Sequence, residues 1–255
     1  IDLIIDSYTR EAGVRTLEKR FAAVCRDVEV RMAEGEDVAQ DSTPEYIEKV
    51  LGPSHGGLQL RESVARLGVS TGVAWTPAGG DLLFVESTKM PGSGNMHLTG
   101  NVGDVMKESV YAAFTYIRAR ATQLGLDEDF FEKLDIHVHL PQGAIPKDGP
   151  AQGVAVYVAL VSMLTQLKVR PDVGMSGELT LRGSVLKVSG IKEKCLAAHR
   201  AGLKHLVFPS RNLPDIEELP AQIRDEVEIH LISRLDEVLP LVLDLPPEPK
   251  AAVAE

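Results

Sequence analysis

Apolar residues at helical spacing characterise the first fifty residues of the chain. Positions 17, 21, 24, 28 and 32 are apolar and predict one long amphipathic helix, with capping residues expected at 6–9 ahead of it. Thr43 and Pro44 predict the N-cap and first position of a second helix, which is expected to end near Gly52. Two such helices bury little apolar surface by themselves. Residues 1–52 are therefore interpreted as the last part of a larger helical domain.

From residue 69 the pattern changes to short apolar runs separated by turn residues. Residues 72–76 and 81–86, joined by a Pro- and Gly-containing turn, predict a β-hairpin. The other expected strands are a short one followed by a turn within 95–103, then 135–140, 173–176, 179–181, 185–188 and 205–208. The expected helices are 105–124, 151–167, 191–200 and 236–243. Mixed strands and helices in this order predict an α/β (α+β) domain with a mixed sheet over 69–245. A turn-rich linker is expected at 53–68 and a disordered tail at 246–255.

Composition restricts the classes of function that remain open. The chain has 27 Lys and Arg against 37 Asp and Glu, a net charge of −10, which disfavours a nucleic-acid-binding role. The longest charge-free apolar stretch, residues 153–167, is too short to span a membrane. Cys25 and Cys195 cannot build a disulfide framework and fit a reducing cytoplasm. The start at Ile1, without a methionine or a leader sequence, indicates a fragment.

The loop before the helix expected at 151 is the first candidate for chemistry. Residues 146–153 contain two prolines and two glycines that would hold a tight turn ahead of the helix. Backbone N–H groups at a helix start stabilise a phosphate or a developing oxyanion, although a plain strand-to-helix connection would have the same pattern. A third interpretation, nucleotide binding through this loop, is disfavoured because the chain lacks a Gly-x-x-x-x-Gly-Lys-Ser/Thr motif.

Lys194 is the second candidate. On the helix expected at 191–200 it is the one charge on the face of small residues, next to Ala198 and Ala201. A lysine among alanines loses hydration, and this lowers its pKa toward the range of a general base. The alternative is a lysine whose ammonium group reaches solvent at the edge of the domain.

The histidines and cysteines offer weaker patterns. His137 and His139 alternate along an expected strand beside Asp135, so their side chains share one face. No further His or Cys follows at a ligand-like interval, so a polar strand face is expected and no metal site is predicted. Neither cysteine has a histidine at a spacing that supports a nucleophilic pair.

Several ordered motifs of the chain resemble one family. They are Pro146-Lys147-Asp148-Gly149-Pro150-x-x-Gly153, then Met175 to Gly183, then Gly190-Ile191-Lys192-Glu193-Lys194 with residues 197–200. Together they resemble the proteolytic domain of Lon, the ATP-dependent protease, and the resemblance covers nearly the whole chain. The run from Tyr8 to Arg15 resembles the end of Lon's AAA+ module, its small helical subdomain, and the resemblance gives Arg15 the position of an ATP sensor.

The resemblance implies a serine–lysine dyad. The family motif reads Pro-Lys-Asp-Gly-Pro-Ser-Ala-Gly, with the serine as nucleophile, so the nucleophile position is 151 and Lys194 is the base. Ser176 falls where members usually have a threonine that could orient the amine. Backbone N–H groups around Asp148, Gly149, Pro150 and residue 151 would form the oxyanion site. Trp75 is expected to pack in the core, with a substrate groove as its alternative position.

The sequence departs from the family at the nucleophile position, where the serine hydroxyl is missing. Position 151 is alanine, followed by Gln152, and alanine offers no hydroxyl for acylation. Ser162, farther along the same helix, is not expected to replace it. The main interpretation is a serine endopeptidase domain inactivated at its nucleophile, and the intact Lys194 favours a deliberate replacement. The alternative is a natural Lon-like module that assembles and binds polypeptide without cleaving it.

The resemblance also implies partners and cofactors. Lon-type proteases degrade unfolded or damaged polypeptides in the cytoplasm and form a homo-oligomer, a six-membered ring whose sites face an internal chamber. ATP and Mg²⁺ would serve the full-length protein. This chain lacks the ATPase core, so no cofactor is expected here, and neither a nucleic acid nor a membrane is expected as a partner.

Overall fold

Helices α1 (Asp2–Tyr8), α2 (Arg15–Ala33) and α3 (Pro44–Leu51) open the chain. The computed structural model describes residues 1–9, 11, 13–36, 43–53, 64–143 and 146–244. One buried residue from each helix, Ile4, Val24 and Ile47, forms a small apolar core that the three helices share. The helical character predicted for the first part of the chain is confirmed. Most of the linker predicted at 53–68 and the whole tail predicted at 246–255 lie outside the described residues.

The ends of these helices agree only in part with the sequence expectation. The Thr43 hydroxyl accepts a hydrogen bond from the backbone of α3 and caps this helix, as predicted. The caps predicted at 6–9 are wrong, because most of these residues belong to α1. The Glu11 carboxylate takes their place. It accepts hydrogen bonds from the N–H groups of Thr16 and Leu17 and so satisfies the start of α2.

A seven-stranded mixed sheet organises the described residues from 64 onward, in the order β3-β4-β2-β1-β5-β8-β9. The pairs β1/β2 and β2/β4 are antiparallel and the others are parallel. The strands are β1 (Val69–Thr76), β2 (Gly79–Pro91), β3 (Met96–Thr99), β4 (Leu134–His139), β5 (Val173–Met175), β8 (His205–Pro209) and β9 (Glu228–Ile232). A separate hairpin pairs β6 (Glu178–Leu179) with β7 (Val185–Leu186). The predicted α/β class with a mixed sheet is confirmed.

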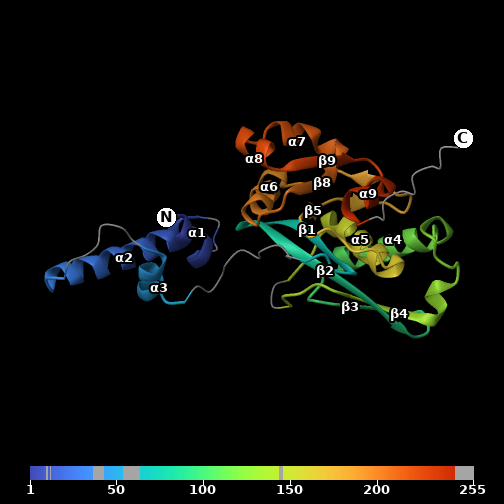
Figure 1. Cartoon of the computed structure of the whole chain (residues 1–255), viewed down its shortest axis with the longest axis horizontal. Coiled ribbons are helices and arrows are strands. Elements are labelled where there is room, and N and C mark those ends of the chain that lie inside the picture. Colours follow the sequence, from blue (N-terminus) through green and yellow to red (C-terminus); the bar gives the residue numbers. More distant parts are fainter. Residues whose placement is uncertain (10, 12, 37–42, 54–63, 144–145, 245–255) are drawn as a thin grey trace, which may run out of the picture.

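Helices cover both faces of this sheet. They are α4 (Asp104–Arg118), α5 (Gly153–Thr165), α6 (Ile191–Arg200), α7 (Leu213–Glu217), α8 (Ala221–Glu226) and α9 (Leu239–Val242). Along β8, Leu206 and Phe208 belong to the core beneath α6, whereas Val207 belongs to the core around α4 and α5. Both α5 and α6 pack on β1 and β2 (Figure 1). Strands β1 and β2 therefore bring together α6, which carries Lys194, and the start of α5, which directly follows the turn (Pro150–Gln152) that contains residue 151.

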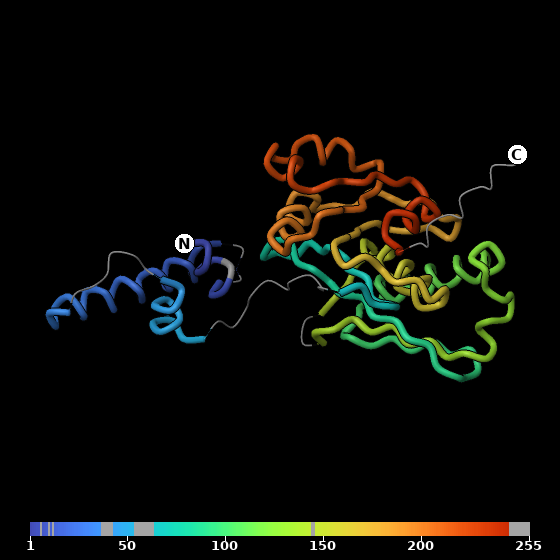
Figure 2. Tube along the Cα trace, viewed as in Figure 1, coloured from blue at the N-terminus to red at the C-terminus, as the bar shows by residue number. Residues whose placement is uncertain are grey.

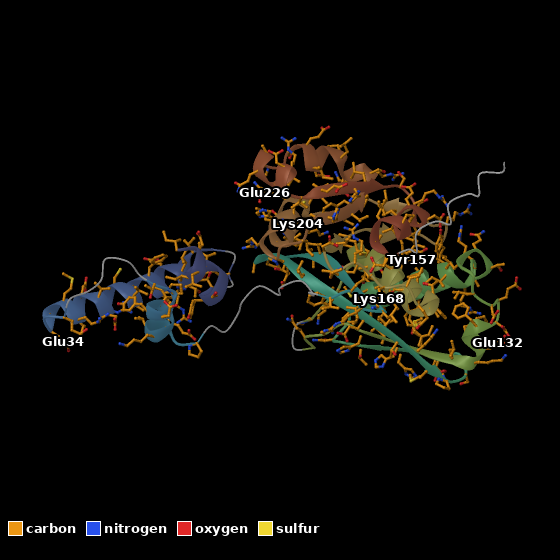
Figure 3. All side chains as sticks on the ribbon, in the orientation of Figure 1. Glu34, Glu132, Tyr157, Lys168, Lys204 and Glu226 are labelled. Carbon is orange, nitrogen blue, oxygen red and sulfur yellow. The ribbon has the colours of Figure 1, made fainter. Side chains whose placement is uncertain are left out.

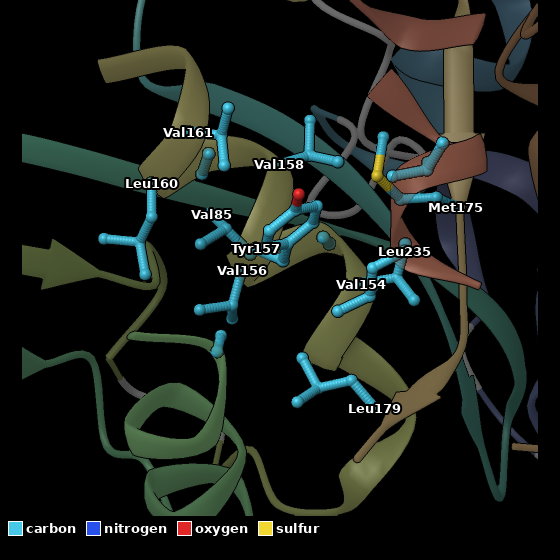
Figure 4. Packing of buried hydrophobic residues seen from close by; sticks show 14 of the residues in the cluster. Val85, Val154, Val156, Tyr157, Val158, Leu160, Val161, Met175, Leu179 and Leu235 are labelled. Carbon is cyan, nitrogen blue, oxygen red and sulfur yellow. The ribbon is translucent and has the colours of Figure 1, made fainter. Parts of the chain in front are cut away.

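Helix α5 is apolar on every side. Every residue from Gly153 to Leu164 is buried, as expected for a helix enclosed between a sheet and other helices. Figure 4 shows its side chains packed against Val85 of β2, Met175 of β5 and Leu235. The apolar run at 153–167 is thus a core helix, and its tight packing fixes the position of residue 151 just before it.

Several elements differ in extent from the sequence expectation. The helix predicted at 105–124 is shorter in the structure, because α4 ends at Arg118 and a separate 3₁₀ turn (Thr122–Leu124) follows. Two further 3₁₀ turns, Pro150–Gln152 and Leu235–Glu237, replace parts of the helices predicted at 151–167 and 236–243. The remaining 3₁₀ turns are Phe130–Lys133 and Ser210–Asn212. Strand β9 and helices α7 and α8 were not predicted, because short elements near the sheet edge carry weak apolar periodicity.

Strand pairing joins segments that are far apart in the sequence. In Figure 2 the traces of β1 and β5 run side by side, and Gly72 pairs with Met175. This pairing places Ser176, the residue after β5, beside the start of α5. Within the described residues, no helix combines the length and the apolar character needed to cross a bilayer.

Candidate active site

A cavity of about 290 Å³ opens beside β1 and β2, at the ends of the loops that lead to α5 and α6. Its lining includes Trp75, the whole run from Pro146 to Gln152, and Lys194. The structure therefore brings together predicted site residues from three separate parts of the chain. Ala151 also borders a second, more open hollow with Lys187 and Asp215, so position 151 is accessible from two sides.

A hydrogen-bond chain connects Lys194 to the backbone of residue 151. The Lys194 Nζ donates to the Ser176 Oγ at 2.9 Å, and the Ser176 hydroxyl donates to the Ala151 carbonyl at 3.1 Å. The Gly177 N–H donates to the same carbonyl at 2.8 Å. These bonds hold the amine of Lys194, the hydroxyl of Ser176 and the start of α5 in one fixed arrangement.

Lys194 lies inside the protein because α6 is pressed against β1 and β2. The lysine is 1% exposed, and its helix neighbours Cys195, Ala197 and Ala198 are buried with it. Burial lowers the pKa of Lys194 from 10.5 to about 8 and raises the pKa of the Cys195 thiol to about 12. An amine with this pKa can accept a proton near neutral pH. The structure has no solvent-exposed ammonium group at this position.

The loop from Pro146 to Pro150 is held by its two charged residues. Asp148 Oδ1 accepts hydrogen bonds from the Met106 N–H at 3.0 Å and the Gly149 N–H at 2.9 Å, which ties the loop to the first turn of α4. Lys147 donates to the carbonyls of Gly100 and Gln142 at 3.1 and 2.7 Å. Burial also lowers the pKa of the Lys147 ammonium. Both side chains thus position the loop.

The predicted oxyanion donors differ in what they can offer. Pro150 has no N–H, and the Gly149 N–H already donates to Asp148. Gly149 has φ 119° and ψ 158°, a conformation open to glycine, which turns the chain just before the 3₁₀ turn. Of the predicted donors, the N–H groups of Asp148 and Ala151 make no hydrogen bond within the described part of the chain.

Trp75 lies at the surface of the cavity. Trp75 is 54% exposed and lines the cavity, so the expectation of core packing is wrong. The indole rests on Gly190, where a Cβ atom would overlap the ring. Because Gly190 is the N-cap of α6, the packing fixes Trp75 relative to the helix that carries Lys194.

Two residues of the cavity were not singled out by sequence reasoning. Lys147 is buried and anchors the loop, and Gln152 is 3% exposed with its Nε2 donating to the Val73 carbonyl at 3.1 Å. The Gln152 Oε1 lies where Gly72 has no side chain and has no hydrogen-bond partner among the described residues. Their place in the sequence could have indicated both residues, because Lys147 lies next to Asp148 and Gln152 lies next to position 151 in the loop motif.

The remaining candidates lie elsewhere. The Ser162 hydroxyl accepts from the Gly68 N–H at 2.9 Å and donates to the Leu167 carbonyl, which is a structural role. His137 and His139 both hydrogen-bond the Thr99 hydroxyl, at 2.9 and 2.7 Å, on the strand face where they were predicted. Arg15 is the first residue of α2 and is exposed.

Lys194 should also lower the stability of the fold. The pKa of Lys194 is about 8 in the folded protein against 10.5 in the unfolded chain. The free-energy cost of burying the charged amine is therefore complete below pH 8 and disappears as the pH rises to 10.5. Lys194→Met should therefore raise the free energy of unfolding at pH 7 by up to about 3 kcal/mol, with no gain at pH 10.5.

Urea unfolding at both pH values measures this difference. Lys192, exposed on the same helix, supplies the matched control Lys192→Met, which should change little. An equal gain for both variants, or a gain that persists at pH 10.5, would contradict the assignment of Lys194 as a buried, desolvated amine.

Comparisons with known proteins show the family of this chain. The family model described as Lon protease (S16) C-terminal proteolytic domain matches residues 42–244, and that of the Lon protease AAA+ ATPase lid domain matches residues 1–41. Lon protease 2 of Sorangium cellulosum is 50% identical over 246 residues, and Lon protease 2 of Myxococcus xanthus is 51% identical over 241. Lon protease of Aquifex aeolicus is 47% identical over 247 residues.

The alignments cover 94–96% of this chain but only 29–31% of the length of these relatives. The proteolytic-domain match covers the whole mixed sheet, and the lid-domain match covers α1 and α2, whereas α3, which shares their apolar core, falls within the proteolytic-domain match. The chain therefore belongs to the Lon protease family and comprises its C-terminal proteolytic domain, preceded by residues of its AAA+ ATPase lid domain.

Proposed function

We propose that this chain is the proteolytic part of an ATP-dependent Lon-type serine endopeptidase that binds unfolded polypeptide but does not cleave it, because position 151 is alanine. The observation that carries the proposal is the bond from Lys194 Nζ through Ser176 Oγ to the Ala151 carbonyl. It places a desolvated amine next to the residue where the family has its nucleophile. The base is in position, and the atom it would activate is missing.

With a serine at 151, the serine oxygen would attack a substrate carbonyl while the neutral amine of Lys194 takes the proton of the serine hydroxyl. The N–H groups of Asp148 and residue 151 would stabilise the oxyanion. The amine would then return the proton to the leaving nitrogen. Ser176 acts as a positioning residue, because it accepts from Lys194 and donates to the backbone of residue 151.

The cavity supports polypeptide as the ligand. Trp75 stands exposed at its surface, and Thr76, Asp81 and Leu82 of the β1–β2 hairpin line it as well. An aromatic anchor beside a mostly apolar hollow suits an extended segment with apolar side chains. Loss of the nucleophile leaves this surface intact, so binding is expected without turnover.

Trp75→Ala should weaken the binding of a fluorescently labelled unfolded polypeptide such as casein by about tenfold or more, as expected for an aromatic anchor. Fluorescence anisotropy on the chain with Ala151 measures the affinity directly. Tyr111→Ala is the matched control, since Tyr111 is 52% exposed and does not line the cavity. Unchanged affinity in the Trp75 variant, or equal losses in both, would exclude Trp75 as part of the binding surface.

A second candidate function is a natural assembly module that binds polypeptide and never cleaves it. The observation in its favour is Gln152, the second departure from the family motif. Its side chain is enclosed beside Gly72 and its Nε2 donates to the Val73 carbonyl, so the fold has room for a glutamine at this position. This candidate gains support if polypeptide binds but Ala151→Ser alone yields no cleavage, and if the natural gene encodes alanine at 151.

Further proposals follow from the family. We propose that the chain acts in the cytoplasm as part of a six-membered ring, with exposed apolar side chains such as Leu181 and Leu213 available for subunit contacts. The free Cys25 and Cys195 are compatible with a reducing compartment. ATP and Mg²⁺ would serve the complete protein. Among the described residues, we assign Arg15 alone to ATP sensing.

A further inference from the structure

Two histidines and a glutamate converge at the edge of the sheet, on strands β8 and β9. His205 pairs with Glu228 in the parallel register, and His230 follows two residues later in β9 on the same face of the sheet. Lys204, labelled in Figure 3, is the residue just before β8 and marks this end of the strand. In the part of the chain that the structure describes, this is the group of three ligand-type side chains close enough to share one metal ion.

The distances between the donor atoms suit a tetrahedral ion. His205 Nδ1 lies 3.2 Å from His230 Nε2 and 3.2 Å from Glu228 Oε2, and His230 Nε2 lies 3.6 Å from Glu228 Oε1. Ligands placed 2.0–2.1 Å from a tetrahedral zinc are about 3.3–3.4 Å from one another. The two histidine nitrogens have this spacing, and the Glu228 carboxylate lies within reach of the same ion, with Oε2 nearer His205 and Oε1 nearer His230.

The surroundings orient His205 for this role. Its other ring nitrogen, Nε2, lies 3.6 Å from Asp172 Oδ2, and the Arg170 guanidinium holds that carboxylate at 3.0 Å. A metal-binding histidine commonly has a carboxylate at its second nitrogen, which fixes the ring and leaves the first nitrogen free for the metal. Both histidine side chains are mostly buried, whereas Glu228 is 64% exposed and leaves a fourth position open to water.

We propose that His205, Glu228 and His230 form a zinc-binding site that joins the edge strand β9 to β8. Two imidazoles and one carboxylate are a donor set that zinc accepts in proteins. Strand β9 ends the sheet and pairs only with β8 in the strand order, so an ion shared by both strands would stabilise the edge. Sequence spacing did not indicate this site, because only strand pairing brings His205 next to residues of β9.

Titration calorimetry of the chain without an affinity tag, first treated with a chelator, against zinc sulfate tests the site. We expect one zinc ion per chain, and a thermal unfolding temperature that rises with zinc. His205→Gln should abolish this binding. Glu228→Gln, at a mostly exposed position, should weaken it without affecting the fold, and Asp172→Asn should weaken it by about 10- to 100-fold.

The double variant His137→Gln/His139→Gln is the matched control, since it removes two of the three neighbouring histidines His97, His137 and His139 and should bind zinc normally. Cobalt absorption adds a readout of geometry, because a tetrahedral cobalt complex absorbs much more strongly than an octahedral one. Absence of binding would overturn the proposal and leave a hydrogen-bonded histidine pair. Binding that survives in both His205→Gln and Glu228→Gln would overturn it as well.

Discussion

Replacing Ala151 with serine is expected to give this chain peptidase activity. Loss of a nucleophilic serine typically costs on the order of 10⁶ in rate, so restoring it should raise cleavage from background by a factor of up to that size. The rest of the site is in place, because Lys194 and Ala151 line the same cavity and Ser176 bridges them. Cleavage of an unstructured fluorogenic peptide measures the gain.

The controls distinguish an effect of the new serine from effects of oligomeric state and of the Gln152 side chain. Ser162→Ala in the Ala151→Ser background should keep the activity, because the Ser162 hydroxyl bonds only backbone groups among its described partners. Oligomeric state is measured by light scattering on the same samples. Ala151→Ser/Gln152→Ala restores the family motif at both positions and shows whether Gln152 obstructs the serine. If neither protein cleaves although both assemble and bind polypeptide, the serine–lysine proposal is wrong.

In the Ala151→Ser protein, activity should depend on the protonation of Lys194. Only the neutral amine can accept the serine proton, and burial sets its pKa at about 8 instead of 10.5. The value of kcat/KM is therefore expected to rise about tenfold per pH unit below pH 8 and to level off above it. A lysine with an ordinary pKa would place that plateau above pH 10.

Lys194→Ala and Lys194→Arg in the same background should each reduce the rate by about 10⁴ or more. Arginine keeps a positive charge but cannot act as a base near neutral pH, so it distinguishes proton transfer from electrostatic stabilisation. Lys147→Arg is the comparison for the other buried lysine of the cavity. Because Lys147 binds two carbonyls and positions the loop, its variant should lose activity without shifting the pH profile. Retained activity in Lys194→Arg would exclude Lys194 as the base.

Local signals in the sequence were sufficient for much of the fold. Residues 191–200 were predicted as a helix with these bounds, and Thr43 was predicted as the cap of α3. Both depend on interactions within a few residues, which a linear pattern records. Strand β9 escaped prediction because its pairing partner, β8, lies about twenty residues away and its own pattern alternates only weakly.

The residues of the candidate site were likewise predicted only in part from the sequence. The spacing of small residues around Lys194 left two alternatives, a buried amine and an amine that reaches solvent, and the structure has the buried one at 1% exposure. The same reasoning misplaced Trp75, since the sequence marks an aromatic residue on a strand but does not record which side of β1 stays uncovered. It also passed over Gln152, whose enclosure depends on Gly72 of a neighbouring strand.

By itself, the sequence determined the family, many of the helices and strands, and the absence of a hydroxyl at position 151, because motifs and side-chain chemistry are local properties. Only the tertiary structure decided that Lys194, Ser176 and Ala151 are joined by hydrogen bonds, and that His205 meets Glu228 and His230. The physical reason is the same in both cases. Strand pairing and helix burial bring distant residues together, and this proximity fixes both the distances between donor atoms and the desolvation that lowers the pKa of Lys194.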